Sequence, residues 1–336
     1  MEIPISTTLL KDFKATKTFK DNQKPITSIC FNDTGDLCVT SAQDESLNVY
    51  DCKDGEKRST LFSKKYGVNL ARFTHASSNV VYASTKEDDT LRYLSLHDNK
   101  YIRYFRGHKQ RVVSLEMSPL DDSLLSASLD NTVRLWDLRS SACQGVVTTT
   151  GRPTAAFDPA GLVFAVGTNS GTVKVYDLRN YESGPFATWN LRDDYYYPDG
   201  IPDWTGLKFS NTGKSILIST VGQTNYLIDA FEGHVKQRLS GHSRLLETSY
   251  GEEAGFAPDG RFVFAGGRDG DLHIWDLENP ANVAGPIHDN RPMCTLTTPH
   301  AGNIRAVGFN PQYMMMVTAS DDLAFWEPKS ALDLAR

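Results

Sequence analysis

Residues 107–137 read GHKQRVVSLEMSPLDDSLLSASLDNTVRLWD, and this stretch decides the fold. Weaker copies of it recur along the chain, at intervals of 40 to 52 residues. The copies end at Tyr50-Asp51, Leu94-Ser95, Trp136-Asp137, Tyr176-Asp177, Ile228-Asp229, Trp275-Asp276 and Trp326-Glu327. Seven copies with this period predict an all-β fold, a propeller of seven four-stranded blades.

Four polar side chains of this stretch predict a hydrogen-bonded staple within one blade. The indole N–H of Trp136 can only donate, whereas the hydroxyl of Ser126 can accept that bond and donate another to His108. Asp130 can then accept from the second imidazole nitrogen. A serine, a histidine and an aspartate also occur together in hydrolases. Because Ser126 lacks the strained G-x-S-x-G turn of such a nucleophile, we expect no catalytic residue here.

The sixth copy carries three of the four members of the staple, His242, Asp269 and Trp275, but has Ala265 where the hydroxyl would stand. We expect these three side chains to form a partial staple. Such decay is tolerated in repeat arrays because stacking between neighbouring blades buries much of the apolar surface.

Composition favours a protein partner over a nucleic acid. The 336 residues include 35 Lys and Arg against 41 Asp and Glu, a formal net charge of −6, so direct nucleic-acid binding is not expected. The five cysteines show no C-x-x-C pair and no histidine at zinc-site spacing, so we expect no metal, no cofactor and no disulfide framework. The start of the chain lacks the pattern of a signal peptide, and no apolar run has the length of a membrane helix. We therefore expect a protein of the cytosol or nucleus that does not contact a membrane.

The repeats use nearly every residue, so we expect residues 1–336 to form a single domain. A propeller must close on itself, since an open edge strand would recruit other chains. The last copy shows three strands, at Ile304–Phe309, Met314–Ala319 and Leu323–Trp326. The N-terminal segment 7–19, with Leu9–Phe19 as the strand itself, is predicted to complete that last blade.

The loops that connect one blade to the next, here called inter-blade loops, all lie on one face of a propeller. Three of them look long, at 190–204, 243–253 and 288–303. We expect these three loops to form a continuous raised wall on that face, which would make it a binding surface.

The first of these loops contains Arg192 and a run of three tyrosines, Tyr195, Tyr196 and Tyr197. Clustered tyrosines are typical of interface hot spots, which makes the loop a candidate partner-binding segment. Alternatively, the rings fold back on the blade as a lid over apolar surface. The sequence leaves both interpretations open.

Other inter-blade loops place basic side chains around the same face, and these are candidate partner-binding residues. They are Lys65 with its neighbour Tyr66, Lys109, Arg111, Arg152 and Arg244. A basic rim can hold an acidic or phosphorylated peptide. The alternative is that these residues are ordinary solvated surface charges.

Several segments of the chain resemble one family of WD-repeat proteins. They are Lys64–Val68, Leu91–Phe105, Gly184–Thr188, Trp204–Ser210, Leu227–Phe231 and Ala324–Trp326. The family is the WD-repeat subunit shared by the COMPASS-type histone lysine methyltransferase complex and the cleavage and polyadenylation factor. The resemblance implies a seven-bladed, non-catalytic scaffold in the nucleus.

The resemblance also implies the partners. They are the catalytic subunit of the histone methyltransferase, the cleavage and polyadenylation factor with its phosphatase module, and the phosphorylated C-terminal repeats of RNA polymerase II. A role in transcription termination follows from the same resemblance. The loop Asp193–Pro202 looks longer and more aromatic than the family pattern, which leaves open the partner segment that docks there.

A second class of function is the substrate receptor of a cullin-type ubiquitin ligase. Its support is a tandem pattern in which Arg139 and Arg179 follow Trp-Asp-Leu and Tyr-Asp-Leu. An arginine at this place can also simply pair with a nearby carboxylate or with a backbone carbonyl late in a strand. An enzyme is the least favoured class, because the sequence has no phosphate-cradling glycine loop and no H-E-x-x-H motif.

Overall fold

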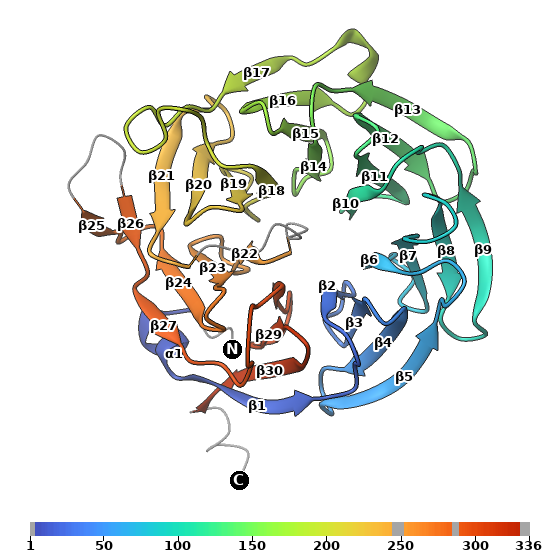
Figure 1. The fold of residues 1–336 in the computed structure, drawn as a ribbon, viewed down its shortest axis with the longest axis horizontal. Coiled ribbons are helices and arrows are strands. Elements are labelled where there is room, and N and C mark those ends of the chain that lie inside the picture. Colours follow the sequence, from blue (N-terminus) through green and yellow to red (C-terminus); the bar gives the residue numbers. More distant parts are fainter. Residues whose placement is uncertain (1–3, 244–251, 284–288, 330–336) are drawn as a thin grey trace.

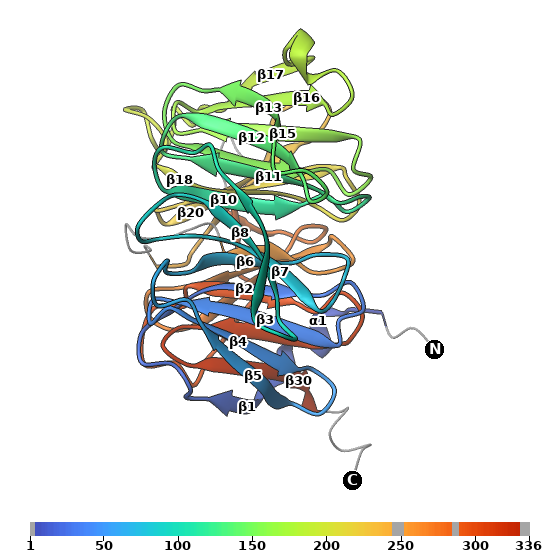
Figure 2. The same cartoon turned by 90° about the vertical axis from the view of Figure 1, so that its right-hand side faces the viewer.

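The computed structural model describes residues 4–243, 252–283 and 289–329, and within them seven β-sheets surround a central axis (Figure 1). In the side view the strands run between the two faces of the ring (Figure 2). The described helices are short, α1 (Thr7–Lys11) and the 3-10 turn η1 (Tyr181–Ser183). The prediction of an all-β, seven-bladed propeller is confirmed.

The first four blades follow one another along the chain, each with its first strand nearest the axis. Blade 1 consists of β2 (Ile26–Phe31), β3 (Leu37–Ala42), β4 (Ser46–Asp51) and β5 (Glu56–Phe62). Blade 2 consists of β6 (Asn69–Phe73), β7 (Asn79–Ala83), β8 (Leu91–Ser95) and β9 (Lys100–Phe105). Blade 3 consists of β10 (Val112–Met117), β11 (Ser123–Ser128), β12 (Thr132–Asp137) and β13 (Cys143–Thr148). Blade 4 consists of β14 (Pro153–Phe157), β15 (Val163–Thr168), β16 (Thr172–Asp177) and β17 (Ala187–Asn190).

The last three blades each contain an irregularity. Blade 5 consists of β18 (Trp204–Phe209), β19 (Ser215–Thr220), β20 (Thr224–Asp229) and β21 (Val235–Ser240), to which two further strands are added. Blade 6 consists of β22 (Ala254–Phe256), β23 (Phe262–Gly266), β24 (Leu272–Asp276) and β27 (Cys294–Leu296). Blade 7 consists of β28 (Ala306–Phe309), β29 (Met316–Ala319), β30 (Leu323–Pro328) and, as its outer strand, β1 (Phe13–Phe19).

The N-terminal strand closes the ring, as the sequence predicted. β1 pairs antiparallel with β30, with Phe13 opposite Pro328 and Phe19 opposite Leu323. The strand is shorter than the predicted Leu9–Phe19, because the residues before it form α1. Ser6 caps that helix, and its hydroxyl accepts a hydrogen bond from the backbone N–H of Leu9 at 3.2 Å. The helix buries Leu10 completely.

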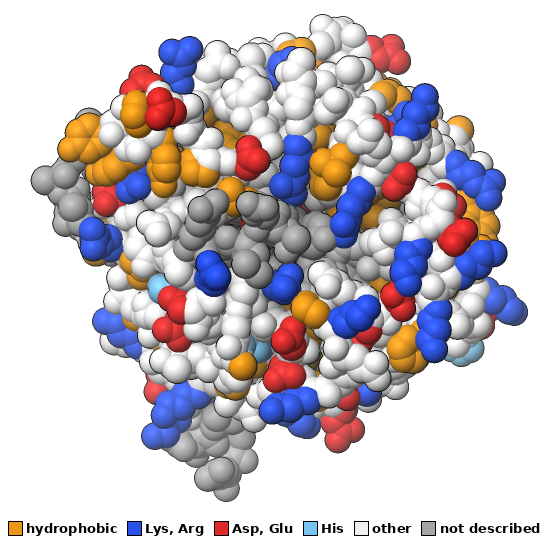
Figure 3. Space-filling view, viewed as in Figure 1, with side chains coloured by type: hydrophobic (Ala, Val, Ile, Leu, Met, Phe, Trp, Pro, Cys, Tyr) orange, Lys and Arg blue, Asp and Glu red, His pale blue; other side chains and the backbone are white. Residues whose placement is uncertain are grey.

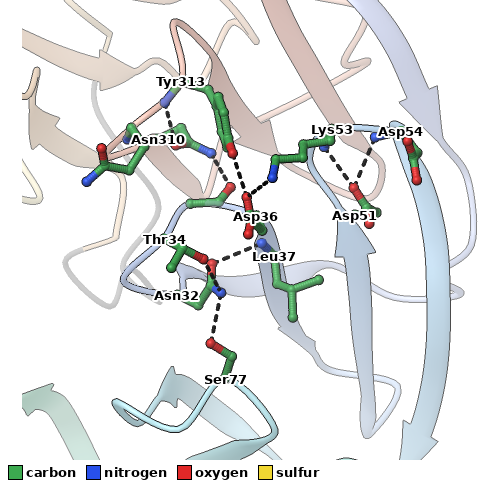
Figure 4. A network of polar contacts seen from close by, with 12 residues as sticks. Asn32, Thr34, Asp36, Leu37, Asp51, Lys53, Asp54, Ser77, Asn310 and Tyr313 are labelled. Carbon is green, nitrogen blue, oxygen red and sulfur yellow. Dashed lines mark hydrogen bonds and ion pairs between the residues drawn. The ribbon is translucent and has the colours of Figure 1, made fainter.

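Polar contacts join the turns of blades 7 and 1 on the inner side of the same junction (Figure 4). The hydroxyl of Tyr313 donates to Asp36 Oδ1 at 2.5 Å, and Lys53 Nζ lies 2.8 Å from the same oxygen. Asn310 Nδ2 donates to the carbonyl oxygen of Gly35 at 2.7 Å. The bonds from Lys53 and then Tyr313 lower the pKa of Asp36 to about 2. Ring closure therefore rests on this cluster as well as on β1.

The prediction of a long inter-blade loop at 288–303 is wrong, because strands occupy part of this segment. One of them belongs to a hairpin that is inserted in blade 6. β25 (Ala281–Val283) and β26 (Asp289–Arg291) pair with each other, and β26 adds in parallel to the outer strand of blade 5. The following residues form β27, the outer strand of blade 6. These strands have three residues each, too few for an alternation that sequence patterning would detect.

The core lies between blades, where the faces of neighbouring sheets stack. Phe105 of β9 and Trp136 of β12 illustrate this, since their ring centroids lie 5.7 Å apart across the boundary of blades 2 and 3. Buried Leu91, Leu115 and Leu124 belong to the same cluster. Each blade thus depends on its neighbours for burial, as expected for a repeat architecture.

Candidate functional site

The four staple residues of blade 3 meet in one hydrogen-bonded chain. Trp136 Nε1 donates to Ser126 Oγ at 2.8 Å, and Ser126 Oγ lies 2.7 Å from His108 Nε2. The other imidazole nitrogen, Nδ1, lies 3.0 Å from Asp130 Oδ2. Burial lowers the pKa of His108, although Asp130 opposes that shift. The Ser126 hydroxyl therefore connects Trp136, on the third strand of the blade, to His108, in the inter-blade loop that precedes the blade.

Blade 6 does not form the predicted partial staple, so the interpretation of His242, Asp269 and Trp275 as a hydrogen-bonded set is wrong. Trp275 Nε1 instead donates to the backbone carbonyl of Ser240 at 3.1 Å. Within the part of the chain that the structure describes, neither ring nitrogen of His242 has a hydrogen-bond partner. The physical reason is Ala265, whose methyl group cannot link the two rings.

A second histidine occupies the space beside this ring. The centroids of His242 and His273 lie 6.3 Å apart, and Asp269 Oδ1 is 3.8 Å from His273 Nε2. Burial, followed by the positive charge of His273, lowers the pKa of His242 to about 3. The imidazole of His242 is therefore neutral and acts as an apolar ring against Trp275.

The predicted basic residues lie on the face that carries the inter-blade loops. Lys65, Lys109 and Arg111 are exposed and Arg152 is partly buried, while Arg244 lies outside the described residues. Figure 3 shows this face, with Lys and Arg side chains at intervals around its middle. The structure thus distributes these cations over the loops before blades 2, 3 and 4 and does not bring them into one pocket.

Tyr66 is held in place by a buried arginine that the sequence analysis did not single out. The guanidinium carbon of Arg92 lies 3.6 Å from the centroid of the Tyr66 ring. Two hydrogen bonds, of 2.8 and 3.0 Å, join Arg92 to the carboxylate of Asp88. Lys65 Nζ lies 5.1 Å from the same tyrosine ring. An exposed ammonium group therefore stands beside an aromatic ring of fixed orientation.

The structure separates the three tyrosines of the loop before blade 5. The Tyr196 ring stacks on Arg238, whose guanidinium carbon is 3.8 Å from the ring centroid. The hydroxyl of Tyr197 accepts a hydrogen bond from Thr224 Oγ1 at 3.3 Å. Tyr195 is 65% exposed. Two of the rings therefore contact the blade, and one faces solvent.

A buried carboxylate anchors this loop. Asp193 is 1% exposed, accepts a hydrogen bond from the Tyr226 hydroxyl at 2.8 Å and lies 3.4 Å from Arg238 Nε. Arg238 also binds Asp289 of β26 at 2.9 Å, so one guanidinium joins the loop to the inserted hairpin. Arg192, by contrast, is exposed and lines a cavity of about 630 Å³ beside the loop.

Charged side chains meet at the centre of the ring, and none of them was predicted from the sequence. Arg72 of β6 forms an ion pair with Glu252, which precedes β22 on the far side of the ring. Burial raises the pKa of Glu116 to about 7, against the opposing charges of Arg72 and Lys208. Arg72, Glu116 and Lys208 each stand one position before the end of the first strand of a blade. Alignment of the copies at that position would have revealed them.

The two arginines that favour a ligase receptor lie on the opposite face. Arg139 is bound to its own neighbour Asp137, with Nη2 2.7 Å from Oδ2. The backbone N–H of Arg179 donates to Asp177 Oδ1 at 2.8 Å. The pairing with a nearby carboxylate, which the sequence left open as the plain alternative, is thus present for the side chain of Arg139.

The described residues contain neither a metal-binding cluster nor a membrane-spanning helix. Among residues 4–243, 252–283 and 289–329, no group of three or more His, Cys, Asp or Glu side chains is placed to hold a metal ion. Their helices are also too short or too polar to span a membrane.

Comparison with known proteins matches three segments to the WD domain, G-beta repeat, at residues 13–51, 99–137 and 232–276. WD repeat-containing protein 82 of Drosophila melanogaster is 45% identical over 330 residues, which cover 98% of this chain and 99% of that protein. The COMPASS component SWD2 of Saccharomyces cerevisiae is 34% identical over 95% of this chain and 96% of its own length. The Set1 complex component swd2 of Schizosaccharomyces pombe is also 34% identical, over 96% of this chain and 99% of its own length.

Proposed function

Because this chain belongs to the family of WD-repeat proteins that includes WD repeat-containing protein 82 and COMPASS component SWD2, we propose that it is a non-catalytic scaffold subunit of a COMPASS-type histone lysine methyltransferase complex. The observation that carries the proposal is the extent of the likeness. The match to the COMPASS component covers 95% of this chain and 96% of that protein, so all seven blades take part. Methyltransferase complexes work on chromatin, and the proposed location is therefore the nucleus.

The proposal extends to a second assembly. The protein also serves the cleavage and polyadenylation factor and its phosphatase module, and it links both assemblies to RNA polymerase II and to transcription termination. The support for this step is the resemblance of the segments between Lys64 and Trp326 to the WD-repeat subunit that the two machineries share. A ring without chemistry of its own can serve two assemblies because its two faces and its outer edge are separate surfaces.

The face of the inter-blade loops is the proposed contact with phosphorylated C-terminal repeats of RNA polymerase II. Lys65 and Lys109 are exposed there, and Tyr66 lies beside Lys65 in an orientation fixed by Arg92. Ammonium groups pair with phosphate, and a fixed tyrosine ring can pack against the proline and tyrosine side chains of such a repeat.

Affinity purification tests the assembly. The tagged full-length protein, isolated from nuclei and identified by mass spectrometry, should bring down the methyltransferase catalytic subunit and the cleavage and polyadenylation subunits. Recovery of a cullin-ligase adaptor in their place, lost on Arg139→Glu and Arg179→Glu, would replace the proposal with the ligase receptor.

Peptide binding tests the phosphate contact. A peptide of two polymerase C-terminal heptads with phosphoserine should bind the wild type, and Lys65→Glu with Lys109→Glu should weaken binding at least tenfold. The matched control reverses two exposed lysines away from this face, Lys14 on β1 and Lys100 on β9. Equal weakening in both double variants would show a general charge effect and would contradict a specific phosphate site.

A further inference from the structure

The outer strands of the blades form the circumference of the ring, and most of them carry charge. Their charged residues are Lys14 and Lys17 in β1, Glu56, Lys57 and Arg58 in β5, Lys100 and Arg103 in β9, and Lys236 and Arg238 in β21. Charged side chains on an edge strand prevent another chain from adding to the sheet. The outer strands β13, β17 and β27 have no such residue, and β13, with six residues, is the longest of the three.

The free edge of β13 presents unpaired backbone groups. Thr149 N–H donates to Asn131 O at 2.9 Å, which sets the register of hydrogen bonds to β12. Since the bonding direction alternates along a strand, the N–H and C=O groups of Val146 and Thr148 point away from β12. In the described part of the chain no strand pairs with β13 on that side. The Val146 side chain is uncharged and 48% exposed, so no charge protects the edge there, whereas the Tyr181 hydroxyl already occupies the carbonyl oxygen of Gln144.

Blade 5 shows what such an edge can accept. There β26 lies along the outer strand β21, with Arg238 opposite Asp289 and Leu239 opposite Asn290. β26 belongs to the insertion between β24 and β27, not to the four strands of blade 5. The molecule therefore already contains one segment from elsewhere that extends the sheet of a blade at its circumference.

A cavity borders β13 on the side of blade 4. It has a volume of about 430 Å³ and is lined by residues 143–147 of β13 and by Tyr176, Tyr181, Glu182, Gly184 and Pro185. The Tyr181 ring lies over the backbone at Gly145, and its hydroxyl donates to Gln144 O at 2.8 Å. Besides Glu182 and the polar groups of β13, the lining includes the apolar side chains of Val147, Tyr176 and Pro185, so the cavity can hold an apolar side chain that projects from a strand lying along β13.

We propose that the free edge of β13 binds an extended, uncharged segment of a partner protein, which becomes the fifth strand of blade 3 and places alternate apolar side chains in the cavity beside Tyr181. Main-chain hydrogen bonds to Val146 and Thr148 supply the contact, and the cavity supplies the selection among sequences. The site lies on the circumference of the ring, away from the basic face, so a partner can bind here while the inter-blade loops are occupied.

Selection from a random dodecapeptide library displayed on phage tests the proposal. Wild-type protein should select peptides in which apolar residues alternate with uncharged polar ones. Val146→Lys should bind the selected peptides at least tenfold more weakly, because the lysine places a charge at the edge. The matched control is Ile102→Lys on β9, an equally exposed apolar residue of a neighbouring outer strand, and it should bind normally.

Hydrogen exchange locates the bound peptide. A selected peptide should slow exchange of the amides of Val146 and Thr148 and leave β9 unchanged. The proposal is overturned if no selected peptide discriminates between the wild type and Val146→Lys, or if protection appears on another element. Dimerisation of the wild type that Val146→Lys abolishes would also overturn it, because the edge would then bind a second copy of the chain.

Discussion

Blades 3 and 6 start from nearly the same residues and make different bonds. Each has a histidine in the loop before the blade, an aspartate in a turn and a tryptophan on the third strand. In blade 3, Ser126 joins the tryptophan to the histidine through bonds of 2.8 and 2.7 Å. In blade 6 the same position holds Ala265, Trp275 turns to a backbone carbonyl, and His242 is left without a partner among the described residues.

Blade 7 shows that the hydroxyl, not the serine as such, makes the difference. There Thr318 stands at the same position and accepts from Trp326 Nε1 at 2.9 Å, while its hydroxyl lies 2.8 Å from His300 Nε2. A hydroxyl can accept one bond and donate another, which no other small side chain does. One oxygen atom therefore decides whether a blade has a staple or an isolated buried imidazole.

Removal of that oxygen from blade 3 should have the largest effect. Ser126→Ala leaves Trp136 Nε1 and His108 Nε2 buried and unpaired, so we expect the free energy of unfolding to fall by about 3 kcal/mol. Urea denaturation followed by tryptophan fluorescence measures the change. Ser141→Ala, at an exposed turn residue, is the control and should change stability by less than about 0.5 kcal/mol. A loss of the same small size at Ser126 would show that its hydroxyl does not hold the staple of blade 3 together.

Acid should distinguish the two histidines. The pKa of His242 is lowered to about 3, so below about pH 6.5 the unfolded chain takes up a proton that the folded chain does not. The contribution of the neutral His242 to the free energy of unfolding is thus fully present above pH 6.5. It is lost as the pH falls toward 3, by about 1.4 kcal/mol per pH unit. His242→Phe should reduce that slope between pH 6 and 5, whereas Ser141→Ala, which removes no titratable group, should leave it unchanged.

The same experiment sharpens the contrast with blade 3. Asp130 opposes the lowering of the His108 pKa, so the contribution of His108 to the acid slope should be smaller than that of His242. Nuclear magnetic resonance of the imidazole protons measures both groups directly. An imidazole of His242 that titrates near pH 6.5 would contradict the burial argument.

The two aspartates should also differ. Asp130 accepts bonds from His108, from the backbone of Lys109 and from Thr132, so Asp130→Asn should lower stability by about 1.5 kcal/mol. Asp269 lies 3.8 Å from His273 and its side chain is 45% exposed, so Asp269→Asn should cost less than about 0.5 kcal/mol. Thermal or urea unfolding of the two variants side by side provides the measurement, and equal losses would remove the distinction between the blades.

One substitution in blade 6 should increase stability. Ala265→Ser places a hydroxyl between His242 and Trp275 and should raise stability by about 1 kcal/mol. Ala257→Ser is the matched control, because Ala257 is equally buried and also lies in an apolar cluster, but it does not hold the second-strand position of the staple hydroxyl, so a new hydroxyl there should destabilise. If both substitutions destabilise alike, the missing hydroxyl is not what separates blade 6 from blade 3.

The period of the copies and the chemistry of single side chains were enough to predict the ring and its closure. The hydrogen bond from Trp136 to Ser126 could also be predicted from the sequence, because an indole N–H can only donate. Ser126 lies on the neighbouring strand opposite Arg134, two residues before Trp136, and its hydroxyl can accept that bond. Blade 6 was predicted wrongly because three matching residue types outweighed the one that was absent. The role of Ala265 becomes visible only when the bonds are counted one by one.

Other features join segments that no local pattern connects. Arg238 binds both Asp193 and Asp289. These two contacts form only because the loop before blade 5 and the inserted hairpin meet in space at Arg238. Arg72 and Glu252 pair across the ring at a separation of 180 residues. The orientation of Tyr196 follows from Arg238, so the sequence alone could not decide between a lid and an interface.

The pairing of β1 with β30 has a consequence for the order of synthesis. Thr16 Oγ1 donates to Phe325 O, an interaction between residues 309 positions apart. Of the strands described, β1 is the first that a ribosome makes and β30 the last, so β1 waits without its partner while the other blades are translated. The charges of Lys14 and Lys17 disfavour the addition of another chain to β1 during that interval. A ribosome that stalls before the last blade therefore releases a stack of sheets with two open ends, a substrate for chaperones and proteases, and not a smaller ring.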